Sequence, residues 1–542
     1  MEKNVQLLDC TLRDGAYIVN AEFGIPAIKG IIKKMQDANI DIIECGWLKD
    51  APHEKGTSYY HVPSDLEQYL SAKKDHATYV AMIDWDRYDL NTLPAYDGKS
   101  IDAIRVVFPK NKYKEGISLG KIIKDKGYQV YFQAANTLDY SVDELIALAN
   151  EINSASPVCL SVVDTFGAMY GEDLAHIVSI LDSHLDHPIK LGFHSHNNQQ
   201  LSFALTMQFV ELLQQRKRHC IVDSSLCGMG RGAGNATTEL VANFLNRSYQ
   251  GNYDMNVIMD AIDMYMQHFQ ANYQWGYSTP YFIAGMYCTH VNNISYLLNN
   301  HRTNARDMRN VIESLSEEDR KKYDYDLLEQ KYIDYQSKMV DDEEALSKLA
   351  AQFENRKILL LLPGKSLVTE REKIDAYIAE NAPIIIGVNA LFQNYPYDYV
   401  FFSNKARYYY AKEIYPELFH AFPRIIASNV KTEGEENEIL VNYNLFIKRG
   451  WEHFDNSGIM CLRLLNKLHA PKIAIAGFDG FSDSYDESYA DISLPRINPG
   501  KAWGELNAEI SDMLADFKRS TKDYMKMEFI TSSKFDEEEP DK

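Results

Sequence analysis

Two histidines, His194 and His196, stand two residues apart at the end of an apolar run of the sequence. In a β-strand, residues i and i+2 point to the same face, so both imidazole rings can reach one point. This spacing is typical of metal ligands. A His-x-His pair can also lie exposed at a strand end. The pair therefore indicates a metal site only where other polar residues reach the same place.

A charged turn near the start of the chain supplies such residues. Arg13 and Asp14 follow the first apolar run, and with the two histidines Asp14 gives an O,N,N donor set. This set suits a divalent ion with open positions for substrate and water. We expect Mn²⁺ or Mg²⁺, with Zn²⁺ and Co²⁺ as alternatives. Arg13 would stabilise a developing oxyanion, and Glu44 would hold Arg13 by a bidentate pair. The alternative is a plain Arg13–Asp14 salt bridge that caps the fold.

A glycine-rich loop lies close to residue 230. Four glycines in seven residues, ending at Gly232 and Gly234, allow the backbone to approach a ligand closely. We predict that Gly232, Gly234 and Asp164 line the substrate. The helix that begins near Asn235 offers its N-terminus to an anion. Cys227, in the same loop, is interpreted as a small loop thiol rather than an acid or nucleophile.

The elements that must position these residues alternate between strand and helix. Apolar runs predict eight strands at residues 5–10, 40–46, 77–83, 103–108, 129–133, 158–163, 190–193 and 221–225. Helical patterns are predicted at 26–38, 63–73, 118–126, 141–150, 171–185, 199–216 and 237–245. Strands alternating with helices favour a parallel sheet, and eight βα units in about 245 residues are typical of a (β/α)8 TIM barrel. Its active site would lie at the C-terminal strand ends, where the polar residues gather. An open doubly wound sheet is the alternative.

The length and composition of the chain predict more than one domain. We predict a barrel at residues 1–250, a helical extension packing on it at 251–300, a charged helical connector at 301–355, a Rossmann-like α/β domain at 356–520 and an acidic, disordered tail at 521–542. A net charge of -21 speaks against a nucleic-acid partner. Seven scattered cysteines, the absence of a signal-peptide pattern and the absence of a long apolar run indicate a cytoplasmic protein without a membrane span.

The second α/β region has a ligand-site pattern of its own. Pro363-Gly-Lys-Ser366 follows a buried strand, but Leu359 stands where the first glycine of a Walker loop would be. In an open α/β sheet the ligand lies at the carboxyl ends of the strands. The predicted ligand residues are Gly364, Ser366, Asn389, Ser457 and Asp479. The region resembles Rossmann-like pyrophosphokinase or glycosyltransferase domains. A structural or oligomerising module without chemistry is the alternative.

Three motifs in one order resemble the DRE-TIM metallolyase superfamily, over about residues 4–295. They are Thr11-Leu-Arg-Asp-Gly15, His194-Ser-His196 and Gly232-Ala-Gly-Asn-Ala-Thr-Thr-Glu239. The 4-hydroxy-2-oxovalerate aldolase branch is the most similar. The resemblance implies that Asp14, His194 and His196 bind the metal, that Asn235 completes or supports its shell, that Arg13 steadies an enolate oxygen and that Glu44 braces Arg13.

The chain departs from that pattern at one position. Aldolases of this branch carry a histidine where this chain has Tyr17, and Claisen-type synthases carry Glu-Gln where it has Ala16-Tyr17. Tyr287 resembles the tyrosine that acts on the aldol oxygen in the aldolases. Tyr17 and Tyr287 are therefore candidate acid–base residues. Packing in a tyrosine-rich protein is the alternative for each.

We accordingly expect a metal-dependent carbon–carbon lyase of aldolase type, acting on a 2-oxo acid such as pyruvate and on an aldehyde. A homo-oligomer is an option. Two other functions stay open: a Claisen-type enzyme that condenses an acyl-CoA, and a non-catalytic binding protein on a retained barrel.

Overall fold

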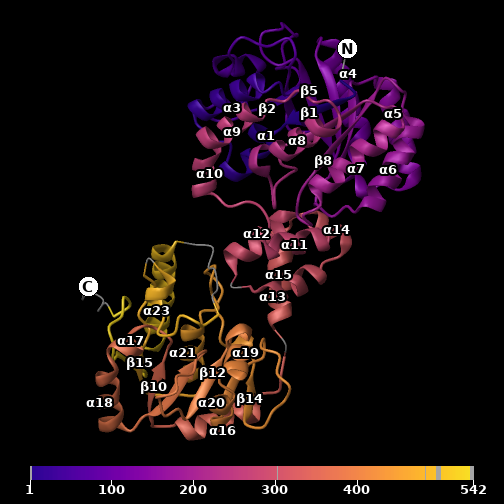
Figure 1. The fold of residues 1–542 in the computed structure, drawn as a ribbon. Helices are drawn as coiled ribbons and strands as arrows, with labels where there is room; N and C mark the ends of the chain where they lie inside the picture. The colour runs from indigo at the N-terminus through magenta and orange to yellow at the C-terminus, as the bar shows by residue number, and fades with distance from the viewer. Residues whose placement is uncertain (1–2, 302, 338, 483, 496–501, 537–542) are drawn as a thin grey trace. The chain divides into compact units, whose positions relative to one another are not determined.

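The structure is a computed structural model that describes residues 3–301, 303–337, 339–482, 484–495 and 502–536 (Figure 1). The chain forms two compact units. Unit 1 contains Met1–Val291 and Arg320–Lys322, and unit 2 contains Asn292–Asp319 and Tyr323–Lys542. The predicted domain limits stay predictions. The last six residues of the predicted acidic tail lie outside the described residues.

Unit 1 is built on a closed parallel sheet. The barrel strands are β1 (Val5–Asp9), β2 (Ile42–Leu48), β4 (Thr78–Asp84), β5 (Ala103–Phe108), β6 (Gln129–Ala134), β7 (Cys159–Asp164), β8 (Lys190–Ser195) and β9 (Cys220–Ser224). They pair in the order β1-β9-β8-β7-β6-β5-β4-β2, and β1 also pairs with β2, which closes the ring. The two-residue strand β3 (Tyr59–Tyr60) is added beside β2. The predicted (β/α)8 barrel is confirmed, and the open-sheet alternative for this region is wrong.

Helices surround the barrel (Figure 1). They are α1 (Thr11–Asp14), α2 (Ala16–Val19), α3 (Ile25–Asp37), α4 (Tyr113–Asp125), α5 (Val142–Ala155), α6 (Gly171–His184), α7 (Ser202–Gln215), α8 (Thr238–Ser248), α9 (Met255–Ala261), α10 (Gln267–Asn272) and α11 (Thr279–Met286). A short π-helix, Ile262–Met266, joins α9 to α10. The helix predicted at 63–73 is instead a 3-10 helix, Pro63–Tyr69, which ends where Leu70 becomes extended. The Asp65 carboxylate stabilises the start of this helix by accepting hydrogen bonds from the backbone N–H groups of His61 and Val62.

Alternate strand residues serve two different cores. One set faces the helices, as where Phe193 of β8 stacks on Phe209 of α7 with ring centroids 5.2 Å apart. The other set fills the barrel interior with a small apolar cluster that includes Leu8, Ile42 and Tyr131. This period of two is what the pleat of a strand dictates. The apolar cluster forms the floor beneath the polar mouth.

The stretch after unit 1's helices is also helical. It contains α12 (Val291–Asn300), α13 (Ala305–Glu313), α14 (Glu317–Lys321), α15 (Tyr325–Gln336) and α16 (Glu343–Phe353). The helical character predicted for residues 301–355 is confirmed. Asn304 and Asp324 begin α13 and α15 by accepting hydrogen bonds from first-turn N–H groups, which is the usual capping by short polar side chains.

Unit 2 is a seven-stranded parallel sheet. Its strands are β10 (Lys357–Leu361), β11 (Ile384–Val388), β12 (Tyr399–Phe402), β13 (Arg424–Ala427), β14 (Glu438–Val441), β15 (Lys472–Ala476) and β16 (Lys526–Phe529). Their order is β14-β13-β12-β11-β10-β15-β16. Leu360 packs into one core and Leu359 into another, so both faces are covered. This is the predicted Rossmann-like, doubly wound arrangement.

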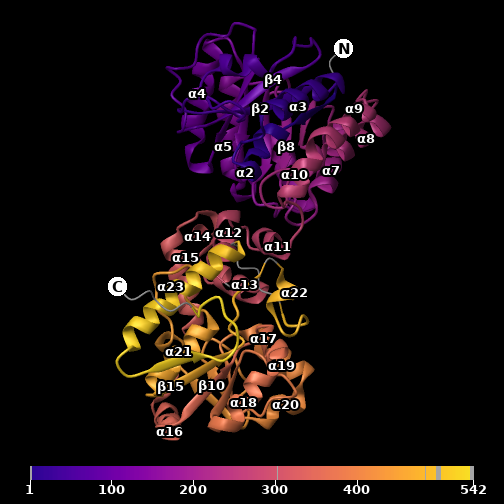
Figure 2. The same ribbon diagram turned by 90° about the vertical axis from the view of Figure 1, so that its left-hand side faces the viewer.

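Helices lie around this sheet (Figure 2). They are α17 (Ser366–Thr369), α18 (Arg371–Asn381), α19 (Lys405–Ile414), α20 (Pro416–Ala421), α21 (Ser457–Lys467), α22 (Tyr485–Ser488) and α23 (Trp503–Thr521). The expectation of a disordered tail after residue 521 is wrong for β16, which pairs with β15. Met527 and Phe529 alternate with charged residues and pack on the core, so four residues suffice for an edge strand.

None of the helices within the described ranges combines the length and the apolar character that crossing a membrane requires.

The Phe193–Phe209 stack gives a test of the barrel's outer core. Phe209 is fully buried, so Phe209→Ala should lower the free energy of unfolding of unit 1 by about 3–5 kcal/mol. Leu240→Ala, on α8 with 47% of the residue exposed, should change it by less than about 0.5 kcal/mol. Urea unfolding followed by tryptophan fluorescence measures both. Equal losses in the two variants would contradict this packing.

Candidate metal centre

Three side chains converge at the C-terminal mouth of the barrel. Asp14 ends α1, directly after β1, while His194 and His196 lie at the end of β8. One ligand atom from each residue lies within 4.8 Å of those from the other two. Asp14 Oδ2 is 3.8 Å from His194 Nε2 and 3.9 Å from His196 Nδ1. These separations are too long for hydrogen bonds and leave room for an ion between the atoms.

The donor atoms fit a divalent ion. Among the residues that the structure describes, Asp14 Oδ2, His196 Nδ1 and Asn235 Oδ1 are buried without a hydrogen-bond partner. A buried polar atom without a partner costs about 1–3 kcal/mol, so three in one place call for a common ligand. An ion held by one carboxylate, two imidazoles and an amide oxygen would satisfy them.

Protonation also favours metal binding. Burial and the neighbouring positive charges lower the pKa of His196 to about 4, so the ring is neutral at pH 7. Burial alone would raise the pKa of Asp14, but the Arg13 charge and the two histidines outweigh it and hold that pKa well below its ordinary value. Both groups are therefore in the form that ligates metals.

Arg13 lies beside this centre with one donor to spare. Its Nε donates to Glu44 Oε2 at 2.8 Å, and its Nη1 donates to Asp14 Oδ1 at 2.9 Å. Arg13 Nη2 is buried and has no hydrogen-bond partner among the described residues. It is available to an oxygen atom of a substrate. The predicted bidentate Glu44–Arg13 pair is not formed: Arg13 contacts only Glu44 Oε2, which a second arginine also contacts.

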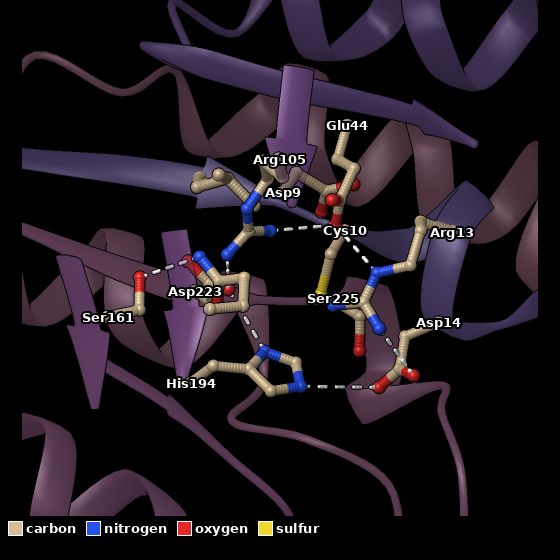
Figure 3. A network of polar contacts seen from close by, with 12 residues as sticks. Asp9, Cys10, Arg13, Asp14, Glu44, Arg105, Ser161, His194, Asp223 and Ser225 are labelled. Atoms are coloured by element: carbon tan, nitrogen blue, oxygen red, sulfur yellow. Dashed lines mark hydrogen bonds and ion pairs between the residues drawn. The ribbon is translucent and has the colours of Figure 1, made fainter. Parts of the chain in front are cut away.

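That second arginine, Arg105 on β5, was not predicted. Its Nη1 donates to Glu44 Oε2 at 2.8 Å and its Nη2 to Asp223 Oδ2 at 2.5 Å. Asp223 Oδ2 in turn lies 3.0 Å from His194 Nδ1, opposite the atom that faces Asp14 (Figure 3). Arg105 thus fixes the carboxylate that orients a metal-facing histidine. The sequence contained one indication of this role, since Arg105 stands within an otherwise apolar predicted strand. A buried arginine requires anionic partners, so acidic residues were to be expected beside it.

The glycine-rich loop packs directly on the centre. A Cβ atom on Gly230 would lie 2.8 Å from Asp14 Oδ2 and 2.4 Å from Asn235 Nδ2. Gly232 and Gly234 adopt positive φ angles, and a Cβ on Gly234 would lie 1.9 Å from the carbonyl oxygen of Gly228. The glycines therefore permit a close turn over Asn235. Their contact with a substrate stays a prediction.

Asp164 and Cys227 have other surroundings. The Asp164 carboxylate accepts from the backbone N–H groups of Ala168 and Met169, at 2.9 and 3.2 Å, and burial raises its pKa to about 7. It shapes the loop after β7, and its role toward a substrate stays a prediction. Burial raises the pKa of Cys227 to about 12, so this thiol is neutral at pH 7.

The two candidate tyrosines come from different elements, α2 and the end of α11. Tyr17 lies edge-on to Trp47, and Arg231 Cζ is 4.7 Å from the Tyr17 ring centroid. Tyr287 directly follows α11, and a Cβ on Gly285 of that helix would lie 3.0 Å from the carbonyl oxygen of Gly167. The helix therefore packs closely on the loop after β7. The five ligand residues predicted for the second α/β region lie in unit 2.

Comparisons with known proteins find similarity over about half of the chain. Residues 110–264 match the family described as HMGL-like. The chain is 27% identical over 260 residues to an oxaloacetate decarboxylase of Mycobacterium tuberculosis. This alignment covers 47% of this chain and 74% of that protein. It is 27% identical over 264 residues to a 4-hydroxy-2-oxovalerate aldolase of Roseiflexus castenholzii, covering 48% and 76%. An HMG-CoA lyase structure from Bacillus subtilis aligns over 49% of this chain and 93% of its own, with 15% identity and a TM-score of 0.40.

The Arg105 bridge generates a prediction on metal affinity. Arg105→Lys keeps the charge but cannot span Glu44 and Asp223, so the orientation of His194 is lost. The affinity for Mn²⁺ should fall about 10–100-fold, as measured from the free-ion signal in electron paramagnetic resonance titrations.

The matched control is Arg218→Lys. Arg218 is also buried, but it binds Asp182 and backbone carbonyls outside the centre. Its replacement should leave the Mn²⁺ affinity unchanged. A similar loss in both variants would mean that Arg105 acts only through stability.

Proposed function

We propose that the HMGL-like domain of this chain is a divalent-metal-dependent carbon–carbon lyase that works through the enolate of a 2-oxo acid such as pyruvate. The observation that carries this proposal is the group of buried atoms without partners in the barrel mouth: Asp14 Oδ2, His196 Nδ1 and, beside them, the donor Arg13 Nη2. Ligand atoms for a cation next to a free guanidinium donor suit a substrate that carries a carboxylate and an adjacent keto oxygen.

The ion would be held by Asp14, His194 and His196, with Asn235 next to them. When bound, Mn²⁺ or Mg²⁺ supplies a Lewis acid for the oxygens of a 2-oxo acid. Arg13 Nη2 donates to the oxygen on which negative charge develops, and its bonds to Glu44 and Asp14 hold it in place before the reaction. Preorganised donors of this kind need little reorganisation during the reaction.

The proposed bond changes balance within one substrate. A base takes the proton of the 4-hydroxyl group, the C3–C4 bond breaks, and its electron pair passes to the enolate as the aldehyde leaves. Protonation at C3 then gives the 2-oxo acid. The names of the two relatives fit this scheme, because loss of an aldehyde and loss of CO₂ both generate the same enolate.

Tyr287 is our candidate for the residue that transfers the proton of the departing hydroxyl group, and Tyr17 is the second candidate. Tyr287 follows a helix that packs on the loop after β7, and Tyr17 follows the metal aspartate by three residues. A tyrosine at that place could move a proton in either direction of the reaction. A Claisen condensation is disfavoured, because Ala16-Tyr17 replaces the Glu-Gln of those synthases.

We further propose a cytoplasmic enzyme, supported by seven free cysteines. An aldehyde is the proposed second substrate. A homo-oligomer stays an option, and the net charge of -21 argues against a nucleic-acid partner.

Exchange of the pyruvate methyl protons with deuterium in the solvent tests the proposed function. The chelator-treated protein should be inactive, and Mn²⁺ should restore exchange. Arg13→Gln at saturating Mn²⁺ should slow exchange about 10²–10³-fold, because one donor to the developing oxyanion is lost.

Arg247→Gln serves as the control, since Arg247 is exposed on α8, and it should exchange at the wild-type rate. Exchange that proceeds equally well without a metal, or none in the Mn²⁺-loaded protein, would refute the proposal.

Tyr287→Phe tests the division of labour between residues. If Tyr287 handles the hydroxyl proton, the variant should cleave 4-hydroxy-2-oxovalerate about 10²–10⁴-fold more slowly. Its exchange of pyruvate protons should stay within about twofold of wild type, because that step involves no 4-hydroxyl group. Tyr17→Phe is measured beside it. A parallel loss of both reactions in Tyr287→Phe would contradict the assignment.

A further inference from the structure

Unit 2 contains a cavity at the carboxyl ends of its strands. Four of the five ligand residues predicted from the sequence line it, namely Gly364, Asn389, Ser457 and Asp479. The fifth, Ser366, donates from its backbone N–H to Asp479 Oδ2 at 2.7 Å.

The cavity lies where the strand order of the sheet reverses. Going along the chain, β11 to β14 are added on one side of β10, whereas β15 and β16 are added on the other. Gly364 follows β10 and Asp479 follows β15, so the carboxyl ends of the two central strands border the cavity. This switch point is where open α/β sheets bind their ligands.

The two sides of the switch point are pressed closely together. A Cβ on Gly364 would lie 2.4 Å from the carbonyl oxygen of Gly477, and one on Gly477 would lie 1.9 Å from that of Leu362. Asp479 secures the turn by accepting from Ser366. Gly364 and Gly477 are both buried, so no side chain separates the two strand ends at this point.

A polar network forms another part of the wall. Asn389 Nδ2 donates to Ser457 Oγ at 2.5 Å, and Asn389 Oδ1 accepts from the backbone N–H of Ser403 at 2.9 Å. Ser403 and Ser457 hydroxyls are 3.0 Å apart. These bonds tie the ends of β11 and β12 to the start of α21, so the wall is rigid and polar.

Two helix N-termini and one arginine lie in this wall. The caps of α19 and α21, Asn404 and Asn456, both line the cavity, so the positive ends of two helix dipoles face it. Arg407, in the first turn of α19, also lines the cavity and is only 5% exposed. The acidic groups in the lining are Asp455 and Asp479. Asp455 accepts a hydrogen bond from the Tyr332 hydroxyl, and Asp479 accepts one from the backbone N–H of Ser366.

Aromatic side chains line the cavity as well. Phe478 and Phe481 follow β15, and Phe535 packs on Phe478 with ring centroids 4.9 Å apart. Tyr489 lies under Arg407, whose Cζ is 5.0 Å from the ring centroid. The cavity thus combines an anion-attracting wall with flat apolar surfaces, which are suited to stacking on a planar ring.

From this combination we propose that the cavity of unit 2 binds a nucleoside phosphate, with its phosphate groups at the starts of α19 and α21 beside Arg407 and its base against the aromatic side chains. The carboxylate of Asp455 is placed to accept a hydrogen bond from a ribose hydroxyl. This site is separate from the metal centre of unit 1 and does not depend on the function proposed for it.

Isothermal titration calorimetry on the full chain tests this proposal, with ADP, GDP, CDP and UDP as separate probes in the presence of Mg²⁺. At least one should bind with a Kd below about 100 μM. We expect this affinity because several polar contacts and one stacked ring together should outweigh the free-energy cost of association. Inorganic phosphate and the matching nucleoside alone should each bind at least tenfold more weakly. Asp14→Asn should bind the same nucleotide unchanged, which separates this site from the metal centre.

Arg407→Gln should weaken binding at least tenfold, whereas Arg519→Gln, at an exposed position of α23, should not. Hydrogen exchange of the wild-type protein gives a measurement that needs no variant. Saturating nucleotide should protect backbone amides at residues 364–366, 455–459 and 477–481. Binding of none of the four probes, equal affinity for phosphate alone, or protection confined to unit 1 would each overturn the proposal.

Discussion

One carboxylate oxygen, Glu44 Oε2, joins the two arginines of the barrel mouth. Arg13 and Arg105 both donate to it at 2.8 Å, from side chains that are almost completely buried. Two guanidinium groups brought this close would repel each other strongly in the low dielectric of the interior. The shared oxygen, with Asp14 on one side and Asp223 on the other, neutralises them. The positions of the candidate metal ligands depend on this balance, because Asp14 and Asp223, the partner of His194, are its two ends.

The barrel itself could be predicted from the sequence because it depends on a regular pattern. Eight apolar runs alternate with amphipathic stretches, and each predicted strand overlaps one in the structure. Asp14, His194 and His196 could also be named, because ligand chemistry restricts the residue types and the strand ends restrict their place. The edge strands β14 and β16 were not predicted, since each has only four residues, too few to show a clear period of two.

The inner side chains of the site were harder to predict. Arg105 stands in an apolar strand, and its partners Glu44 and Asp223 are 61 and 118 residues away. Only a closed barrel brings these strands together, so the pairing is a property of tertiary structure. The same holds for the cavity of unit 2. Its residue types were recognisable, but the closeness of Gly364 to Gly477 follows from the order of the strands.

Closure of the barrel also determines when the metal centre can exist. The hydroxyl of Thr11, just after β1, accepts from the backbone N–H of Leu226, just after β9, across a separation of 215 residues. The ion's ligands come from both ends of that interval. During synthesis, β1 therefore cannot pair with β9 until the last barrel strand has been made. Contacts of such long range form slowly. An ion held by Asp14, His194 and His196 would bind only to chains in which the ring has already closed. Metal uptake would then report completed folding.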